Sequence, residues 1–386
     1  MRVAIDARPA IFSRKTGIGY YTWHLLRNLP TIDPDTDYLA WYLNARALAG
    51  GPSRLLEGVP VRQRWTPIPS WWFERLTERF ELPRVEWFAR FDVLFAPNFV
   101  PPPTRARRLV VTVHDLAFRR HPETAPQSTR WWLARIDRTL ERAARIIAVS
   151  EATKRDLIEL YGVEAERVAV IPHGVDREVF HPSTREEVER IRRRYTIDGP
   201  YLLSLGGLEP RKNLPNLVRA FARLPADDRP TLVLAGGSVE WNPEGRDALH
   251  ATLRELPSDV RQGVVLTGYV GEQDKVALLG GAEALVYPSL YEGFGLPVLE
   301  AMACGTPVLT SDVSALPEIA GDAALLVDPR DPEAIASAMT RILGDVDLRR
   351  DLSERGSSRA AGFAWEKTAR STAGVLHEAA EGRLRG

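Results

Sequence analysis

Two carboxylates around a glycine-containing loop form the strongest chemical pattern in this chain of 386 residues. The apolar run 284–287 predicts a buried strand, and the helix after it has Pro297 in its first turn, where a missing N–H costs little. Between them, free N–H groups at the positive end of the helix predict a phosphate site formed by Gly293, Phe294, Gly295 and Leu296. Glu292 in the loop and Glu300 in the helix flank it. This favours a ligand with hydroxyls on both sides of a phosphate, such as a nucleotide sugar.

A second pattern, Gly206 to Asn213, directly follows the apolar run 201–205. Gly207 lets the backbone approach a ligand at the carboxyl end of a parallel strand, and the adjacent Arg211 and Lys212 can neutralise a diphosphate. The chain has 46 arginines and only five lysines, so a lysine at this position is suggestive. The segment alone equally allows a solvated Arg-Lys pair at the start of a helix.

Three weaker signals follow strands in the first half of the chain. Gly17 and Gly19 lie after the first apolar run, but the third glycine of the dinucleotide-binding fingerprint is missing. The run 109–113 delivers His114 to a strand end, where a lone histidine is more often structural than catalytic. His173 is another strand-end group. These residues indicate a functional site only when they are considered together with the two stronger patterns.

Short apolar runs alternate with helical stretches along the chain, as expected of buried parallel strands in βαβ units. Two sets of six runs predict an α/β fold with two doubly wound domains. The expected strands are 2–6, 38–43, 92–96, 109–113, 145–149 and 167–171 in the first set, and 201–205, 231–235, 264–267, 284–287, 307–310 and 324–327 in the second. The turn-like segment 176–184 predicts the boundary, and the tail 365–384 predicts a last helix.

Composition restricts the class of function. The chain has 51 basic and 51 acidic residues, so no nucleic-acid partner is expected, but residues 1–180 hold 27 basic and 21 acidic side chains, which suggests an anionic ligand for that half. A single cysteine, Cys304, excludes an intramolecular disulfide and a thiolate metal cage. Neither a signal peptide nor a membrane-spanning stretch is visible, so the sequence predicts a cytoplasmic protein.

Eight of the ten tryptophans lie within residues 1–132, and residues 46–145 carry 18 basic and 10 acidic side chains. Such aromatics and arginines could form an acceptor surface or a shallow contact with anionic lipid headgroups. The partly helical spacing favours core packing with solvated arginines. Peripheral contact with the inner face of the membrane stays open as an alternative. The tryptophans concerned include Trp65, Trp71, Trp72, Trp87, Trp131 and Trp132.

Taken together, these motifs resemble the retaining family 4 glycosyltransferases, whose GT-B fold has two Rossmann-like domains facing each other across a cleft. The resemblance covers essentially the whole chain. It rests on Glu292 and Glu300 as an E-x7-E pattern and on 206–213 as G-G-x-x-x-R-K-N. It also rests, in this order, on Gly17-Ile18-Gly19, His114 and 171–176. His173 departs from the pattern, because many relatives carry asparagine there.

The resemblance implies a nucleotide-sugar site in a C-terminal domain, 179–365. It implies an acceptor site in an N-terminal domain, 1–178, completed by the helix 366–386. The diphosphate would be held, without a metal, by Arg211 and Lys212. The ribose would bind Glu300, and the transferred sugar would meet Glu292 and His114. The remaining contacts implied are backbone groups of Gly17, Gly19, Gly207, Phe294, Gly295 and Leu296, with the base pocket near Tyr269 and Val270.

The local sequence at 6–8, 17–22 and 207–213 is most similar to bacterial mannosyltransferases that use GDP-mannose. The resemblance therefore implies mannosyl transfer, with retention of configuration, to a glycan or lipid-linked acceptor. UDP-glucose and other nucleotide-hexose donors stay open. So do an epimerase, a sugar phosphorylase and a non-catalytic nucleotide-sugar-binding protein on the same fold.

Neither a cofactor nor a metal is expected. The aspartates within 33–37 could suggest a calcium loop, which needs glycine at its sixth position and glutamate at its twelfth. Those positions are Tyr38 and Asn44 in this chain. The segment therefore predicts a polar turn before a strand.

Overall fold

The computed structural model describes residues 1–386 except 13–14, 51–55, 125–129, 228, 238–242 and 383–386. Contacts within the chain divide it into two compact units. Unit 1 comprises Met1–Leu116, Gln127–Gly174 and Ala364–Gly386, and unit 2 comprises Ala117–Pro126 and Val175–Phe363. The end of the chain thus belongs to unit 1, and a short segment from its first half belongs to unit 2.

Unit 1 is built on a seven-stranded parallel sheet of order β3-β2-β1-β4-β5-β6-β7. The strand order reverses between β1 and β4, the position at which doubly wound sheets bind ligands. The strands are β1 (Arg2–Asp6), β2 (Asp37–Leu43), β3 (Arg62–Thr66), β4 (Val93–Ala96), β5 (Leu109–Val113), β6 (Arg145–Ala148) and β7 (Val168–Val170).

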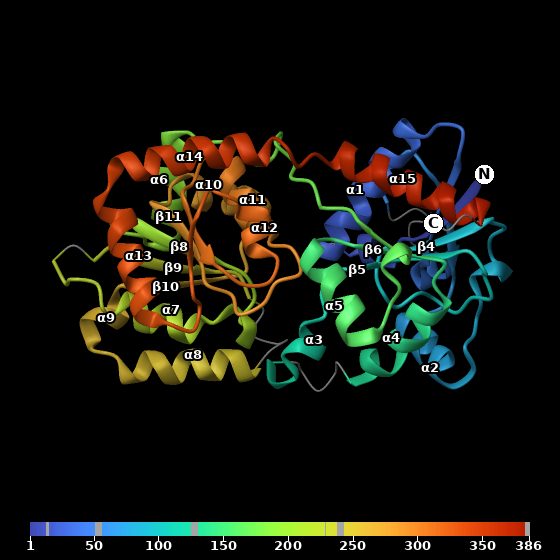
Figure 1. Ribbon diagram of the computed structural model, residues 1–386, viewed down its shortest axis with the longest axis horizontal. Coiled ribbons are helices and arrows are strands. Elements are labelled where there is room, and N and C mark those ends of the chain that lie inside the picture. Colours follow the sequence, from blue (N-terminus) through green and yellow to red (C-terminus); the bar gives the residue numbers. More distant parts are fainter. Residues whose placement is uncertain (13–14, 51–55, 125–129, 228, 238–242, 383–386) are drawn as a thin grey trace. The chain divides into compact units, whose positions relative to one another are not determined.

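The last helix of the chain is part of the core of unit 1. It packs beside α1, and the two helices share one hydrophobic core with the sheet, which includes Tyr21, Leu25, Trp365 and Leu376 (Figure 1). The helices of unit 1 are α1 (Gly17–Ile32), α2 (Ser70–Phe80), α4 (Arg130–Arg142), α5 (Glu151–Tyr161) and α15 (Trp365–Glu381).

Unit 2 contains a six-stranded parallel sheet of order β10-β9-β8-β11-β12-β13, which reverses between β8 and β11. The strands are β8 (Tyr201–Leu205), β9 (Thr231–Ala235), β10 (Val264–Gly268), β11 (Ala284–Tyr287), β12 (Val308–Ser311) and β13 (Leu325–Val327). Leu202, Val286 and Leu309 are fully buried in its core. Both sheets have the doubly wound α/β architecture that the apolar runs predict.

Helices flank the sheet of unit 2, with α7 against α8 and α13, and α6 against α10 (Figure 1). They are α3 (Ala117–Arg120), α6 (Arg185–Tyr195), α7 (Leu214–Phe221), α8 (Pro243–Glu255), α9 (Ser258–Gln262), α10 (Glu272–Gly280), α11 (Leu296–Ala303), α12 (Leu316–Ala320), α13 (Pro332–Gly344) and α14 (Val346–Ala360). None of the helices in the described parts of the chain combines the length and the apolar character that crossing a bilayer requires.

Three tryptophans of unit 1 depart from the predicted core packing, whereas Trp65 packs partly buried against the core. Trp41 is fully buried, but Trp71, Trp72 and Trp87 expose 58%, 50% and 60% of their surface. Helix α2 buries Phe73 on its other face, which leaves the indoles of Trp71 and Trp72 on the surface. Core packing is therefore the wrong prediction for these three tryptophans. The side chains of Trp131 and Trp132 lie outside the described residues.

Candidate active site

The segment after β8 places two cations at the carboxyl end of the sheet of unit 2. Arg211 and Lys212 end a short 3-10 turn, and Asn213 follows in the left-handed conformation with φ of 60°. The side-chain amide of Asn213 donates to the backbone carbonyls of Pro288 (3.0 Å) and Pro329 (2.6 Å). The two cations are therefore fixed against the loop that follows β11.

A carboxylate lies between these two cations. Oε1 of Glu292 accepts a hydrogen bond from Nζ of Lys212 at 2.6 Å, and Oε2 accepts one from Nη1 of Arg211 at 2.6 Å. The hydroxyl of Tyr287, the last residue of β11, donates to the same Oε1 at 2.8 Å and accepts from Lys212 at 2.5 Å. Arg211 also pairs with Glu209 at 2.7 Å. Glu292 and Lys212 are both buried, so this charged cluster lies largely out of water.

The cluster fixes the protonation of its members. Burial raises the pKa of Glu292, but the charges of Arg211 and Lys212 outweigh it, and the pKa falls from 4.5 to about 2. Burial and the charge of Arg211 lower the pKa of Lys212, against the opposing pull of Glu292. Burial and the charge of Glu292 raise the pKa of Tyr287 well above its ordinary value. Near neutral pH, Glu292 is therefore an anion and Tyr287 a hydrogen-bond donor.

The loop before α11, where the sequence predicts an anion site, is held in one conformation by a glycine and a hydrogen bond. Gly295 has φ of +111°, a conformation that favours glycine, and a Cβ there would come within 2.9 Å of Leu316. The backbone N–H of Glu292 donates to Oγ of Ser314 at 3.0 Å, which fixes the start of the loop. The N–H groups of Gly295 and Leu296 have no acceptor among the described residues. They therefore remain available to a ligand at the N-terminus of α11.

Glu300 lies further along α11 and has a partner of its own. Its Oε1 accepts a hydrogen bond from Nζ of Lys275 in α10 at 2.7 Å. Gly207 follows β8, and Tyr269 and Val270 follow β10, the former 53% exposed and the latter buried. Because β8, β10 and β11 are parallel, these residues occupy the same edge of the sheet as the Arg211, Lys212 and Glu292 cluster.

In unit 1, packing explains Gly19, one of the two glycines at the start of α1. The helix begins at Gly17, and Thr16 caps it by accepting a hydrogen bond from the N–H of Gly19 at 3.4 Å. A Cβ at position 19 would lie 2.7 Å from the carbonyl oxygen of Pro9. Glycine is therefore required at position 19 for the helix to approach the turn that precedes it.

His114 directly follows β5 in unit 1, and it is not a lone histidine. Its Nε2 lies 2.8 Å from the carbonyl oxygen of Pro97, and its Nδ1 lies 3.3 Å from Nε2 of His173. The ring of Tyr21 stands edge-on to both imidazoles, at centre distances of 5.0 and 4.8 Å. Burial lowers the pKa of both histidines, so the pair is neutral at physiological pH.

The sequence does not predict three of the contacts described above, those of Tyr287, Lys275 and His173. Tyr287 ends an apolar strand, and nothing in its local sequence indicates that its hydroxyl joins a charged cluster. Lys275 could have been found by the argument used for Lys212, because it is another of only five lysines. His173 is singled out by the sequence, but its contact with His114 is made only by the sheet. Among the described residues, no cluster of three or more His, Cys, Asp or Glu could hold a metal ion.

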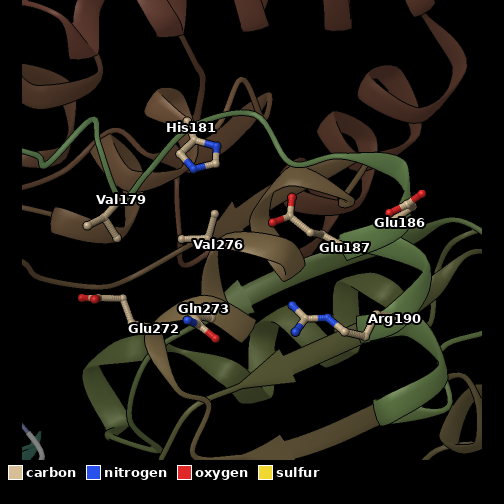
Figure 2. Close-up of a pocket in the computed structure, with 8 residues that line it drawn as sticks. All are labelled: Val179, His181, Glu186, Glu187, Arg190, Glu272, Gln273 and Val276. Carbon is tan, nitrogen blue, oxygen red and sulfur yellow. The ribbon is translucent and has the colours of Figure 1, made fainter.

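A pocket of about 620 Å³ lies elsewhere in unit 2 (Figure 2). Its walls come from α10, from α6 and from the segment before α6. Oε2 of Glu187 is engaged in capping α6, where it accepts a hydrogen bond from the N–H of Thr184 at 2.8 Å. The pocket contains none of the residues that are predicted to bind the nucleotide sugar. It is lined by Val179, His181, Glu186, Glu187, Arg190, Glu272, Gln273 and Val276.

Comparison with known proteins finds sugar-transferring enzymes among the relatives of this chain. The family model described as Glycosyl transferases group 1 matches residues 187–359, and that described as Glycosyltransferase Family 4 matches 16–179. The O-antigen chain mannosyltransferase B of Escherichia coli is 33% identical over 282 residues, 71% of each chain. The MMP alpha-(1→4)-mannosyltransferase of Mycolicibacterium hassiacum is 29% identical over 419 residues, 94% of this chain and 95% of that one.

Solved structures show the same fold at lower identity. The sucrose-phosphate synthase from Thermosynechococcus elongatus has a TM-score of 0.73 and 22% identity over 98% of each chain. Anabaena HepE in complex with UDP-glucose has a TM-score of 0.72 and 19% identity over 98% of this chain and 100% of that one. The chain therefore belongs to the family 4 glycosyltransferases, with two Rossmann-like parallel-sheet domains of the GT-B fold, and it is an enzyme that transfers sugars.

Proposed function

We propose that this glycosyltransferase moves mannose from GDP-mannose, with retention of configuration and without a metal, to a glycan or lipid-linked acceptor. The observation that carries the proposal is the cluster of Arg211 and Lys212 around Glu292, in which Lys212 and Glu292 are buried. Two fixed cations beside a helix N-terminus offer a diphosphate the charge that a bound metal supplies elsewhere. The names of the relatives at 33% and 29% identity support mannose as the sugar.

The donor would lie along the carboxyl edge of the sheet of unit 2. Arg211 and Lys212 bind the diphosphate, and the N–H groups at the start of α11 meet the phosphate and the sugar hydroxyls. Glu300 accepts from the ribose hydroxyls through an oxygen that Lys275 leaves open. The base lies near Tyr269 and Val270, beyond Gly207. Glu292 contacts the transferred sugar while it remains paired with the two cations.

The reaction breaks the bond between the anomeric carbon and the leaving phosphate oxygen. The acceptor oxygen forms its bond to the same carbon from the same face, and the proton of the acceptor hydroxyl passes to the leaving phosphate. The products are the mannoside and GDP, and Arg211 and Lys212 stabilise the charge that develops on the phosphate. Retention follows because attack and departure share one face of the sugar.

Unit 1 would supply the acceptor side. The hydrogen bond from the N–H of Gly19 to Oγ1 of Thr16 is long, at 3.4 Å, so a phosphate oxygen can replace Oγ1 as the acceptor. The neighbouring Gly17 is exposed. His114 lies beside the transferred sugar in this proposal.

The exposed Trp71, Trp72 and Trp87 support a peripheral contact of unit 1 with the inner face of the membrane, which would place both units in the cytoplasm.

A donor panel tests the proposal. The purified protein is incubated with GDP-mannose, GDP-glucose, UDP-glucose or UDP-galactose, and free nucleotide is measured with and without a mannoside acceptor. We expect GDP release from GDP-mannose that the acceptor accelerates. We also expect GDP to raise the melting temperature more than UDP does at equal concentration. Turnover of UDP-glucose in preference to GDP-mannose would overturn the donor assignment.

A further inference from the structure

The pair formed by His114 and His173 has a hydrogen-bond direction that the chemistry of its partners determines. The carbonyl oxygen of Pro97 can only accept, so Nε2 of His114, 2.8 Å away, carries a hydrogen. In a neutral imidazole, Nδ1 of His114 is then an acceptor. The hydrogen between the two rings must therefore sit on Nε2 of His173, 3.3 Å from that acceptor.

The arrangement of the two rings allows a hydrogen bond between their nitrogens. Their planes are inclined by only 26°, and their centres are 5.3 Å apart. With the two nitrogens 3.3 Å apart, that separation fits rings that meet edge to edge, as a hydrogen bond between ring nitrogens requires. Both nitrogens of His114 are therefore engaged by groups of unit 1.

The surroundings hold His173 in place. The carbonyl of Pro172 accepts a hydrogen bond from Oγ1 of Thr368 in α15 at 2.8 Å. A Cβ at Gly174 would lie 2.4 Å from the backbone nitrogen of Trp365, so only glycine lets α15 approach this turn. The ring of Trp365 lies 5.9 Å from that of His173. The last helix of the chain thus fixes the residue that contacts His114.

We propose that His173 is a positioning residue: its Nε2–H donates to Nδ1 of His114 and holds the ring, in the Nε2–H tautomer that the carbonyl of Pro97 sets, in its orientation beside the transferred sugar. The inference rests on the proposed function only in placing His114 beside that sugar. Its chemical consequence is that His114 cannot accept the proton of the acceptor hydroxyl. Its one basic nitrogen is already bound to His173, which leaves the leaving phosphate to take that proton.

The test replaces His173, the proposed hydrogen-bond donor, with side chains of similar size. His173→Phe retains an aromatic ring and removes the hydrogen, whereas His173→Asn offers an amide N–H for the same acceptor. His24→Phe is the matched control, because His24 is buried in the same aromatic cluster and stacks on Trp365 at 4.4 Å. Circular dichroism and melting temperature verify that each variant folds.

Two measurements are made on each protein. Proton–nitrogen correlation spectra of the ligand-free protein report which nitrogen of His114 carries the hydrogen, with His114→Gln assigning the signals. Release of GDP from GDP-mannose gives kcat and KM. We expect the Nε2–H tautomer in all three proteins, because the carbonyl of Pro97 is present in each. We expect the signal of Nδ1 of His114 to shift only in His173→Phe, where that nitrogen loses its hydrogen-bond donor. We also expect kcat of His173→Phe to fall about tenfold with KM for the donor little changed, and His173→Asn to restore most of it.

The outcomes separate this inference from the donor assignment. A wild-type His114 protonated at Nδ1 would overturn the inference, whichever nucleotide sugar the enzyme uses. Turnover of His173→Phe equal to that of the wild type would also overturn it, since the contact with His173 would then not position His114 for the reaction. If GDP-mannose is not the donor, the spectra still decide the hydrogen-bond direction, and the kinetics are repeated with the nucleotide sugar that turns over.

Discussion

Nζ of Lys212 lies 2.6 Å from Oε1 of Glu292, and the two residues reach each other from the ends of neighbouring strands β8 and β11. Arg211 approaches the other carboxylate oxygen at the same distance. A carboxylate of the protein thus holds a buried lysine and a half-buried arginine close together. In the proposed function, a diphosphate would find both cations already in place, which would limit the reorganisation required on binding.

Replacement of Lys212 by alanine should lower turnover by about two to three orders of magnitude, the scale for loss of one charge-stabilising group. GDP release from GDP-mannose is the measurement. Lys367→Ala is the control, because Lys367 is an exposed lysine of α15. Turnover within a few-fold of the wild type in Lys212→Ala would place the phosphate site elsewhere.

Tyr287→Phe should lower both stability and turnover. It removes the hydroxyl that donates to Glu292 and accepts from Lys212, so the carboxylate and the ammonium lose a shared partner. We expect a loss of about 1–2 kcal/mol in the free energy of unfolding and a fall in kcat/KM. Tyr201→Phe is a matched control, since the buried hydroxyl of Tyr201 donates to Leu278 at 2.8 Å, away from the cluster. Equal kinetic effects of the two variants would contradict a role for Tyr287 in the site.

The sequence predicts the parts of the fold that rest on continuous apolar runs. The second sheet follows closely from runs such as 201–205 and 231–235, because strands buried on both faces must be apolar throughout. Strand β3, Arg62-Gln63-Arg64-Trp65-Thr66, is not predicted. It is an edge strand on which exposed and more buried residues alternate, so its polar side chains interrupt the pattern.

The site is predictable only as far as local motifs reach. Arg211, Lys212 and Glu292 belong to short motifs with a chemical meaning, and the fold brings them together. The contacts of Tyr287 with Lys212 and of His173 with His114 join segments that only the folded sheets bring together, and one sequence does not reveal such contacts. The exposed Trp71 and Trp72 show the same limit, because helical spacing alone does not reveal which face a helix buries.

The stability of the protein should fall in acid partly through Glu292. Folding lowers the pKa of this carboxyl from 4.5 to about 2, so the folded state binds fewer protons than the unfolded state between these values. The resulting contribution, about 3 kcal/mol, is present above pH 4.5 and is lost as the pH falls toward 2. Urea unfolding at a series of pH values should show a shallower acid loss in Glu292→Gln than in the wild type. Parallel curves would contradict the assigned shift.

Activity should persist in excess chelator, because Arg211 and Lys212 supply the positive charge that the leaving phosphate needs. GDP release is measured after dialysis against EDTA and again after addition of magnesium or manganese. We expect less than a twofold difference between the two conditions. Complete loss with the chelator, followed by recovery with a metal, would show that the two cations alone do not suffice.

Transfer should retain the anomeric configuration without a covalent intermediate on Glu292. One carboxylate oxygen of Glu292 is bound to Lys212 and Tyr287 and the other to Arg211, so neither is free to attack the sugar. A pKa of about 2 also makes this carboxylate a weak nucleophile. Proton NMR of freshly formed product from the α-linked donor should therefore show an α linkage. Intact-protein mass spectra after rapid quenching should show no added hexose. A β product would exclude retention, whereas a hexose adduct mapped to Glu292 would replace same-face attack with double displacement through that residue.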